Sequence, residues 1–142
     1  MDLKKGILLG AGLGLLVLGI FIYNTTDLAS QAIRYQLGVY GTSIYEYRVA
    51  TGRWPESAAD LARTSIPGRF RHWQDELLSG TVVVIWPHNM EPNPRDNGHR
   101  ILAYFNGGLI ARFGRKWVLW GDLRTEYLPN DKLTTALQAA KD

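Results

Sequence analysis

Histidine is the residue type in this chain best suited to acid–base or metal chemistry, and it occurs three times, at His72, His88 and His99. Their separations of 16 and 11 residues match no ligand pair on a helix or a hairpin. The chain has no cysteine, so it lacks a thiolate ligand and a Cys-His nucleophile pair. It also contains no GxSxG elbow and no phosphate-binding loop. The sequence therefore predicts a protein that is not an enzyme and holds no cofactor or metal.

The loop from Pro87 to Gly98 carries the other oxygen-rich side chains, which are Asn89, Glu91, Asn93, Asp96 and Asn97. Oxygen ligands suit calcium, but their spacing is not that of an EF-hand. An ordinary turn-rich loop is the preferred interpretation. The alternative is that the loop is the recognition element of an extracytoplasmic ligand-binding module. No residue identifies a ligand, and a small-molecule ligand is not expected.

Arginines concentrate in one part of the chain. The whole sequence has 16 basic and 13 acidic residues, a net charge of +3 that is too small to argue for nucleic acid. In the arginine-rich stretch only Glu56 and Asp60 are acidic, and the basic residues are Arg48, Arg53, Arg63, Arg69 and Arg71. We expect a solvated face here, and contact with lipid headgroups or an acidic partner is the alternative.

Two of the five tryptophans suggest an interface. Trp117 and Trp120 lie on one predicted strand at an odd separation, so they point to opposite faces. We expect one indole to be buried and the other to contact a partner protein or lipid headgroups. For each tryptophan taken singly, packing in the core is the preferred interpretation.

The chain begins with the pattern of a membrane anchor. An uncharged apolar run at residues 6–23 follows Lys4 and Lys5. As a helix this run reaches about 27 Å, close to the hydrocarbon thickness of about 30 Å. The two lysines place residues 1–5 in the cytoplasm by the positive-inside rule. The sequence thus predicts a transmembrane helix at 6–23 and an extracytoplasmic domain at 24–142.

Three glycines in this run recur every four residues: Gly6, Gly10 and Gly14. On a helix they form a strip without side chains, against which another helix can pack closely. We therefore expect the bilayer and the transmembrane helices of a protein complex to be the partners of this segment.

The long helix should continue beyond the anchor. Apolar residues with helical spacing are Ile33, Leu37, Tyr40, Ile44 and Tyr47, and no proline interrupts residues 6–49. A short helix is expected at 56–63 and a terminal helix at 132–140. Between them the patterns predict strands at 81–86, 100–105, 109–113, 116–120 and 123–128. The fold class is therefore α+β, with a long helix covering an antiparallel meander.

Two short stretches stand out against this order of elements. The closing pair of strands runs from Trp117 to Leu128, and the stretch after the long helix reads Tyr45-x-Tyr47-x-x-x-Thr51-Gly52-Arg53-Trp54-Pro55. In place and composition both stretches resemble those of type IV pilins and type II secretion pseudopilins. The resemblance implies a pilin-like fold anchored in a bacterial inner membrane, with its main domain on the periplasmic side.

Ala11 marks a departure from that family, whose mature chains carry a glutamate at the fifth position after a cleaved glycine. If Lys4-Lys5-Gly6 ends the leader, Ala11 stands where the glutamate belongs. That glutamate neutralises the amino terminus of a neighbouring subunit during filament assembly. We therefore expect a non-enzymatic subunit of a larger membrane complex, such as a respiratory or photosynthetic one. The alternative is a pseudopilin or minor pilin of a secretion or pilus system.

Overall fold

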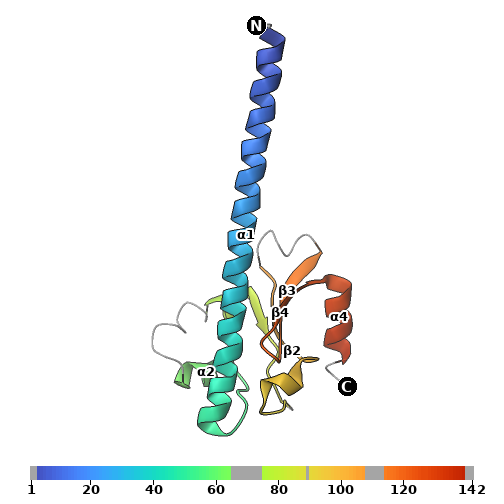
Figure 1. The fold of residues 1–142 in the computed structure, drawn as a ribbon. Coiled ribbons are helices and arrows are strands. Elements are labelled where there is room, and N and C mark those ends of the chain that lie inside the picture. The colour runs from blue at the N-terminus through green and yellow to red at the C-terminus, as the bar shows by residue number, and fades with distance from the viewer. Residues whose placement is uncertain (1–2, 65–74, 89, 108–113, 140–142) are drawn as a thin grey trace. The chain divides into compact units, whose positions relative to one another are not determined.

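The computed structural model describes the backbone of residues 3–64, 75–88, 90–107 and 114–139, and the side chains of these except 3–14, 20–25 and 64. The chain forms two compact units, Met1–Ile33 and Arg34–Asp142. In chain order (Figure 1) the elements are α1 (Leu3–Thr51), α2 (Ala58–Thr64), β1 (Val82–Val84), the 3-10 helix η1 (Pro94–Asn97), β2 (Ile101–Phe105), β3 (Arg115–Trp120), β4 (Thr125–Pro129) and α4 (Asn130–Ala139).

Helix α1 is one continuous element of 49 residues, as the absence of proline predicts. It ends where Gly52 adopts a φ of 75°, a conformation that glycine reaches without strain. The Gly52 N–H donates to the Arg48 carbonyl at 2.9 Å and closes the last turn.

The predicted span at 6–23 lies mostly on residues whose side chains are outside the described part. Within the residues that are described, no helix is both long and apolar enough to cross a membrane.

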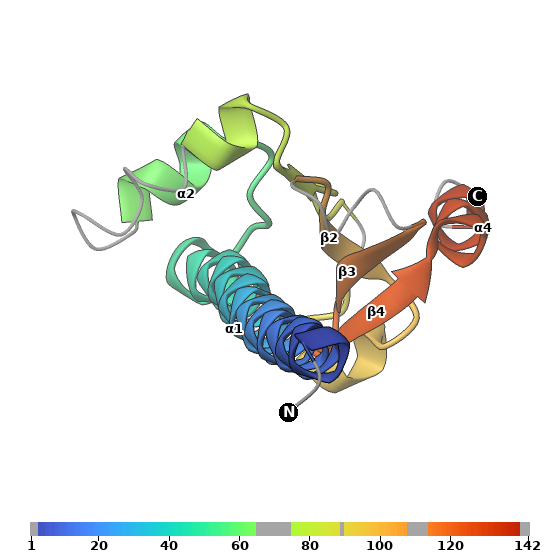
Figure 2. The same cartoon turned by 90° about the horizontal axis from the view of Figure 1, so that it is seen from above.

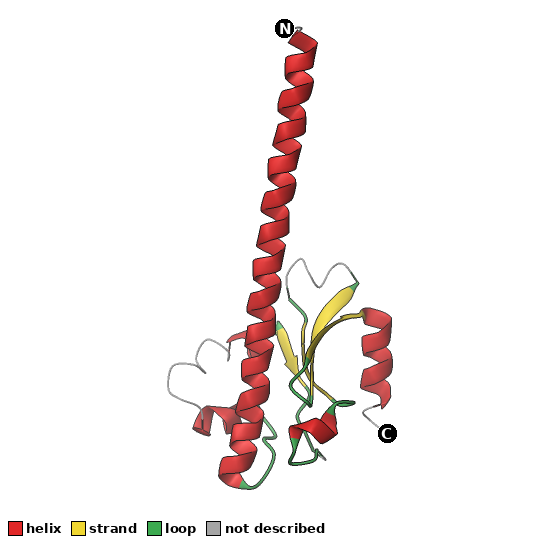
Figure 3. Cartoon of the chain, viewed as in Figure 1, coloured by secondary structure: helices red, strands yellow, loops and turns green. Residues whose placement is uncertain are grey.

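Four strands form an antiparallel sheet in the order β1-β2-β3-β4, the predicted meander (Figure 3). The register pairs Val83 with Tyr104, Tyr104 with Val118, and Val118 with Glu126. A bulge interrupts the pairing of β2 with β3 between Ile101 and Ala103. Strands that are neighbours in the sheet are thus also consecutive among the described strands of the chain.

Helices cover both faces of this sheet (Figure 2). On one face lies the C-terminal part of α1, whose Leu37, Tyr40 and Ile44 are fully buried. On the other face, α4 packs its Leu133 in a cluster with Ile101, Val118 and Leu128 of the strands. A long helix packed on a four-stranded antiparallel sheet is a pilin-like architecture.

Strand β1 is shorter than predicted, covering 82–84 instead of 81–86, and only its Val82 is buried. The Ile85 N–H still donates to the Leu102 carbonyl at 2.7 Å, but Pro87 has no N–H to extend the ladder. The predicted strand at 109–113 lies outside the described residues.

Candidate interaction surface

Trp117 and Trp120 point to opposite faces of β3, as their spacing predicts. Trp117 lies on the side of α1, where the Arg34 guanidinium stands 5.4 Å from the centre of its ring. Trp120 packs against the cluster that holds α4. The expectation that one indole is buried and the other presented is wrong, because both are half-buried. An arginine covers part of each ring and leaves the remainder accessible.

Around Trp117, arginines and aromatic rings alternate across the end of the sheet. The Trp117 and Tyr127 rings lie 5.2 Å apart, and the Arg115 guanidinium lies 4.9 Å from the Tyr127 ring. Arg34 also donates from Nε to Thr125 Oγ1 at 3.3 Å. The Trp117 indole N–H is buried, and no described residue offers it an acceptor. These contacts make a partly exposed patch on strands β3 and β4, which we call the Trp117 patch: Trp117, Tyr127, Arg34 and Arg115.

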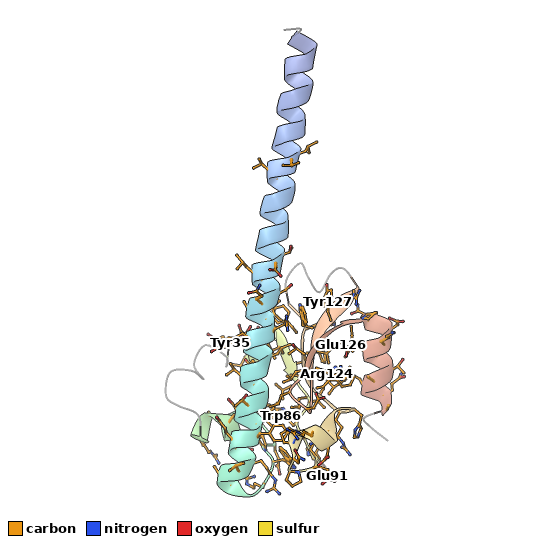
Figure 4. All side chains as sticks on the ribbon, viewed as in Figure 1. Tyr35, Trp86, Glu91, Arg124, Glu126 and Tyr127 are labelled. Atoms are coloured by element: carbon orange, nitrogen blue, oxygen red, sulfur yellow. The ribbon has the colours of Figure 1, made fainter. Side chains whose placement is uncertain are left out.

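The polar edge of Trp120 is satisfied inside the chain. Its indole N–H donates to Glu126 Oε2 at 3.0 Å, and Arg124 Nη1 donates to the same oxygen at 2.9 Å. Figure 4 shows Arg124 and Glu126 at β4 and the turn before it. Arg124 also stands 5.3 Å from the centre of the Trp120 ring. Trp120 is thus held within its own domain more completely than Trp117.

The glycines of the predicted helix-packing strip, Gly6, Gly10 and Gly14, fall within the helical backbone of α1. Their surroundings lie outside the described residues, so the strip remains a prediction. The described side chains that follow it are apolar and exposed: Leu15, Leu16, Val17 and Leu18.

The loop from Pro87 to Gly98 is organised by the fully buried Asn97 at the end of η1. Its Nδ2 donates to the Glu91 carbonyl at 2.8 Å and the Asn93 carbonyl at 3.1 Å, and its Oδ1 accepts from the Glu91 N–H at 3.0 Å. Nδ2 also lies 3.0 Å from Tyr45 Oη, which donates to the Gly121 carbonyl at 2.6 Å. We call Asn97, Tyr45 and their partners the Asn97 clasp.

Asn97 has a structural role, because both atoms of its side-chain amide form hydrogen bonds within the protein. Among the residues that the structure describes, no three histidine, aspartate or glutamate side chains gather where they could hold a metal ion. His88 and His99 are both exposed, and His72 lies outside the described residues.

An open pocket of about 280 Å³ lies at the C-terminal end of α1. Its lining combines the start of the arginine-rich stretch with the start of the loop from Pro87 to Gly98, which we call the proline loop. The lining residues are Arg48, Gly52, Arg53, Trp54, Glu56, Pro87 and His88. Sequence reasoning noted the arginines but not this grouping, because His88 lies far along the chain from them. Of the other arginines, Arg63 is exposed, while Arg69 and Arg71 lie outside the described residues.

The comparisons with known proteins add no family to this geometry. No protein-family model matches the chain, and no curated protein or solved structure matches it either.

Proposed function

We propose that this chain is a non-catalytic, membrane-anchored subunit of a larger membrane protein complex, with its pilin-like domain on the extracytoplasmic side. Residues 6–23 serve as the anchor, and the domain contributes contacts to the complex through surfaces such as the Trp117 patch.

The observation that carries this proposal is the apolar surface of α1 at four consecutive positions. Leu15, Leu16, Val17 and Leu18 are 71%, 61%, 59% and 53% exposed. Successive helical residues are rotated by about 100°, so these four side chains point in all directions around the helix axis. A helix that is apolar all round needs lipid or other helices on every side. The lysines before the run and the lack of charge within it support lipid as that environment.

Membrane retention tests the anchor. We expect the full chain to stay with the membrane fraction after alkaline extraction. Replacing Leu15 and Leu18 together with arginine should release most of it, because each arginine near the centre of a span costs about 3 kcal/mol. Tyr35→Arg is the matched control, since Tyr35 is 73% exposed on the same helix but lies beyond the predicted span. Finding the unaltered chain in the soluble fraction would rule out the anchor.

Co-purification tests the complex. After extraction in a mild detergent, the chain should carry other membrane proteins with it. Gly10→Leu together with Gly14→Leu should remove them, since the added side chains hold a neighbouring helix away. Gly19→Leu is the control because Gly19 lies in the same run on a different face of the helix. Equal loss of partners in both variants would count against the strip as the contact.

A pseudopilin-like subunit is the second candidate, favoured by the pilin-like architecture and by the Thr51-Gly52-Arg53-Trp54-Pro55 turn that ends α1. Amino-terminal sequencing of the protein from its native membrane separates the two candidates. Cleavage after Gly6 would reject the fixed subunit, and an intact Met1 would reject the pseudopilin.

A further inference from the structure

The pocket at the C-terminal end of α1 lies where the chain leaves the helix. Figure 1 shows the chain turning back there toward α2. The positive φ of Gly52 reverses the backbone, so that Arg53 and Trp54 line the same pocket as Arg48 on the last turn of the helix. Thr51 Oγ1 supports this turn by accepting from the Arg53 N–H at 3.4 Å.

Trp54 is a fixed wall of the pocket. Its indole N–H donates to the Met90 carbonyl at 3.1 Å. Its ring meets the Tyr45 ring edge to face, with centres 5.2 Å apart and planes at 82°. Tyr45 belongs in turn to the Asn97 clasp, so the wall is tied to the core of the domain.

Arg48 lies beside the Trp54 ring, and its buried Nε–H has no acceptor among the described residues. Its guanidinium lies 5.7 Å from the centre of that ring. None of the ion pairs among the described residues includes Arg48. Arg48 therefore brings to the pocket lining a guanidinium that no described carboxylate neutralises, and a guanidinium binds an oxygen acceptor from outside the chain by charge-assisted hydrogen bonds.

The other pocket residues indicate which acceptor fits. Arg53 adds a second guanidinium, although it also stands 3.6 Å from Asp60. His88 can donate a further hydrogen bond. Glu56 contributes one negative charge to the lining, which disfavours a dianion. A carboxylate and a phosphate both match the fork of a guanidinium, but the single charge of a carboxylate is better tolerated beside Glu56.

We propose that this pocket binds a carboxylate group through Arg48, assisted by Arg53 and His88. The carboxylate comes either from an acidic side chain of a partner protein or from a small free acid, and both present the same group to Arg48. This inference does not depend on the membrane anchor, because every residue of the pocket lies in the second unit.

Titration of the full chain in a non-ionic detergent, followed by ¹H–¹⁵N NMR of the tryptophan indoles, tests the site. The probes are butyrate, a free acid with a single carboxylate, and a glutamate-containing tripeptide with blocked ends. We expect a saturable shift of the Trp54 indole resonance, assigned with Trp54→Phe. The probe with the greater affinity identifies the source. Inorganic phosphate and chloride at equal ionic strength are the comparison anions.

Arg48→Met keeps the length and apolar contacts of the side chain and should weaken binding of the better probe about tenfold or more. Arg95→Gln removes an exposed arginine outside the pocket lining and should leave the affinity unchanged. An unchanged thermal unfolding midpoint shows that Arg48→Met is folded. Three results would overturn the proposal: no saturable shift with either carboxylate, phosphate binding as tightly as the better carboxylate, or equal effects of the two arginine substitutions.

Discussion

The side chain of Asn97 joins the proline loop to Tyr45 of helix α1, and the Tyr45 hydroxyl in turn donates to the Gly121 carbonyl in the β3–β4 turn. Because the amide is fully buried, its loss removes hydrogen bonds from the Glu91 N–H and from the Glu91 and Asn93 carbonyls. The clasp should therefore stabilise the fold far more than an exposed amide does.

We predict that Asn97→Ala lowers the free energy of unfolding by about 3 kcal/mol. Asn106→Ala is the control, since Asn106 is exposed and its Oδ1 accepts a hydrogen bond from Lys116 Nζ. The Asn106→Ala substitution should lower the free energy of unfolding by about 0.5 kcal/mol or less. Urea unfolding measures both. Similar values for the two variants would show that the clasp contributes little.

Tyr40 gives the domain a dependence on alkaline pH. Burial raises the pKa of this phenol well above its ordinary value, and the nearby Glu76 carboxylate, which lies 3.4 Å from the hydroxyl, raises it further. The folded state therefore holds the Tyr40 proton more tightly than the unfolded chain does. Its contribution to stability is complete below the unfolded pKa of about 10 and is lost as the pH rises above it.

We predict a larger fall in the urea midpoint between about pH 8 and about pH 11 for the unaltered chain than for Tyr40→Phe. The phenylalanine variant has no phenol to ionise on unfolding, so its fall is smaller. Tyr35→Phe removes a tyrosine that is 73% exposed and should behave like the unaltered chain. An equal fall in Tyr40→Phe would show that Tyr40 does not cause the effect.

Among the elements, the contact of α1 with the sheet depends on a close approach at Gly41. A Cβ there would lie 2.7 Å from Leu123 Cδ2 and 3.0 Å from Leu119 Cδ2, both shorter than ordinary contacts. A Cβ added at Gly38, one turn earlier, would have no neighbour within 4 Å and so would meet open space. The two glycines therefore offer a matched test on one helix.

Gly38→Ala should raise the free energy of unfolding by about 0.5–1 kcal/mol, because alanine favours the helix. Gly41→Ala has the same helical gain but overpacks the interface, so we expect a net loss of about 1 kcal/mol. Urea unfolding of both variants measures the difference. Stabilisation by both substitutions would show that the helix moves away from the sheet at little cost.

At the scale of the whole molecule, the second unit has a core of its own. The largest fully buried side chains all follow residue 34, and they are Leu37, Tyr40, Ile44, Pro55, Leu61, Val82, Asn97, Leu102, Val118 and Leu119. A domain that contains all of its core residues should fold without the segment before it.

We predict that the fragment 24–142 is monomeric without detergent and unfolds in one cooperative step. Its midpoint should lie within about 3 °C of that of the full chain in non-ionic detergent, a shift that corresponds to less than about 1 kcal/mol. Circular dichroism and sedimentation measure these properties. A broad transition, or a much lower midpoint, would show that residues 1–23 stabilise the domain.

Patterns local in the sequence predicted most of the architecture. The spacing of Leu37, Tyr40 and Ile44 predicted the buried face of α1, and short apolar runs predicted the meander and the helix after it. Local patterns succeed here because helices and strands arise from contacts between near neighbours in the chain. The end of β1 was placed too late because valine-rich runs carry no marker for the last ladder bond.

The tertiary structure alone decided the environments of the candidate sites. Trp54 reaches its acceptor 36 residues away, Tyr45 meets Asn97 at a separation of 52, and Gly121 at 76. No periodicity encodes such distances, since they depend on how the turn after α1, the proline loop and the β3–β4 turn come together. For the same reason, the positions of Trp117 and Trp120 on opposite faces of β3 did not predict that Arg34 lies over one ring and Arg124 over the other. The residue types in the sequence identified the candidate site residues, and the packing of distant segments determined which of these residues are in contact.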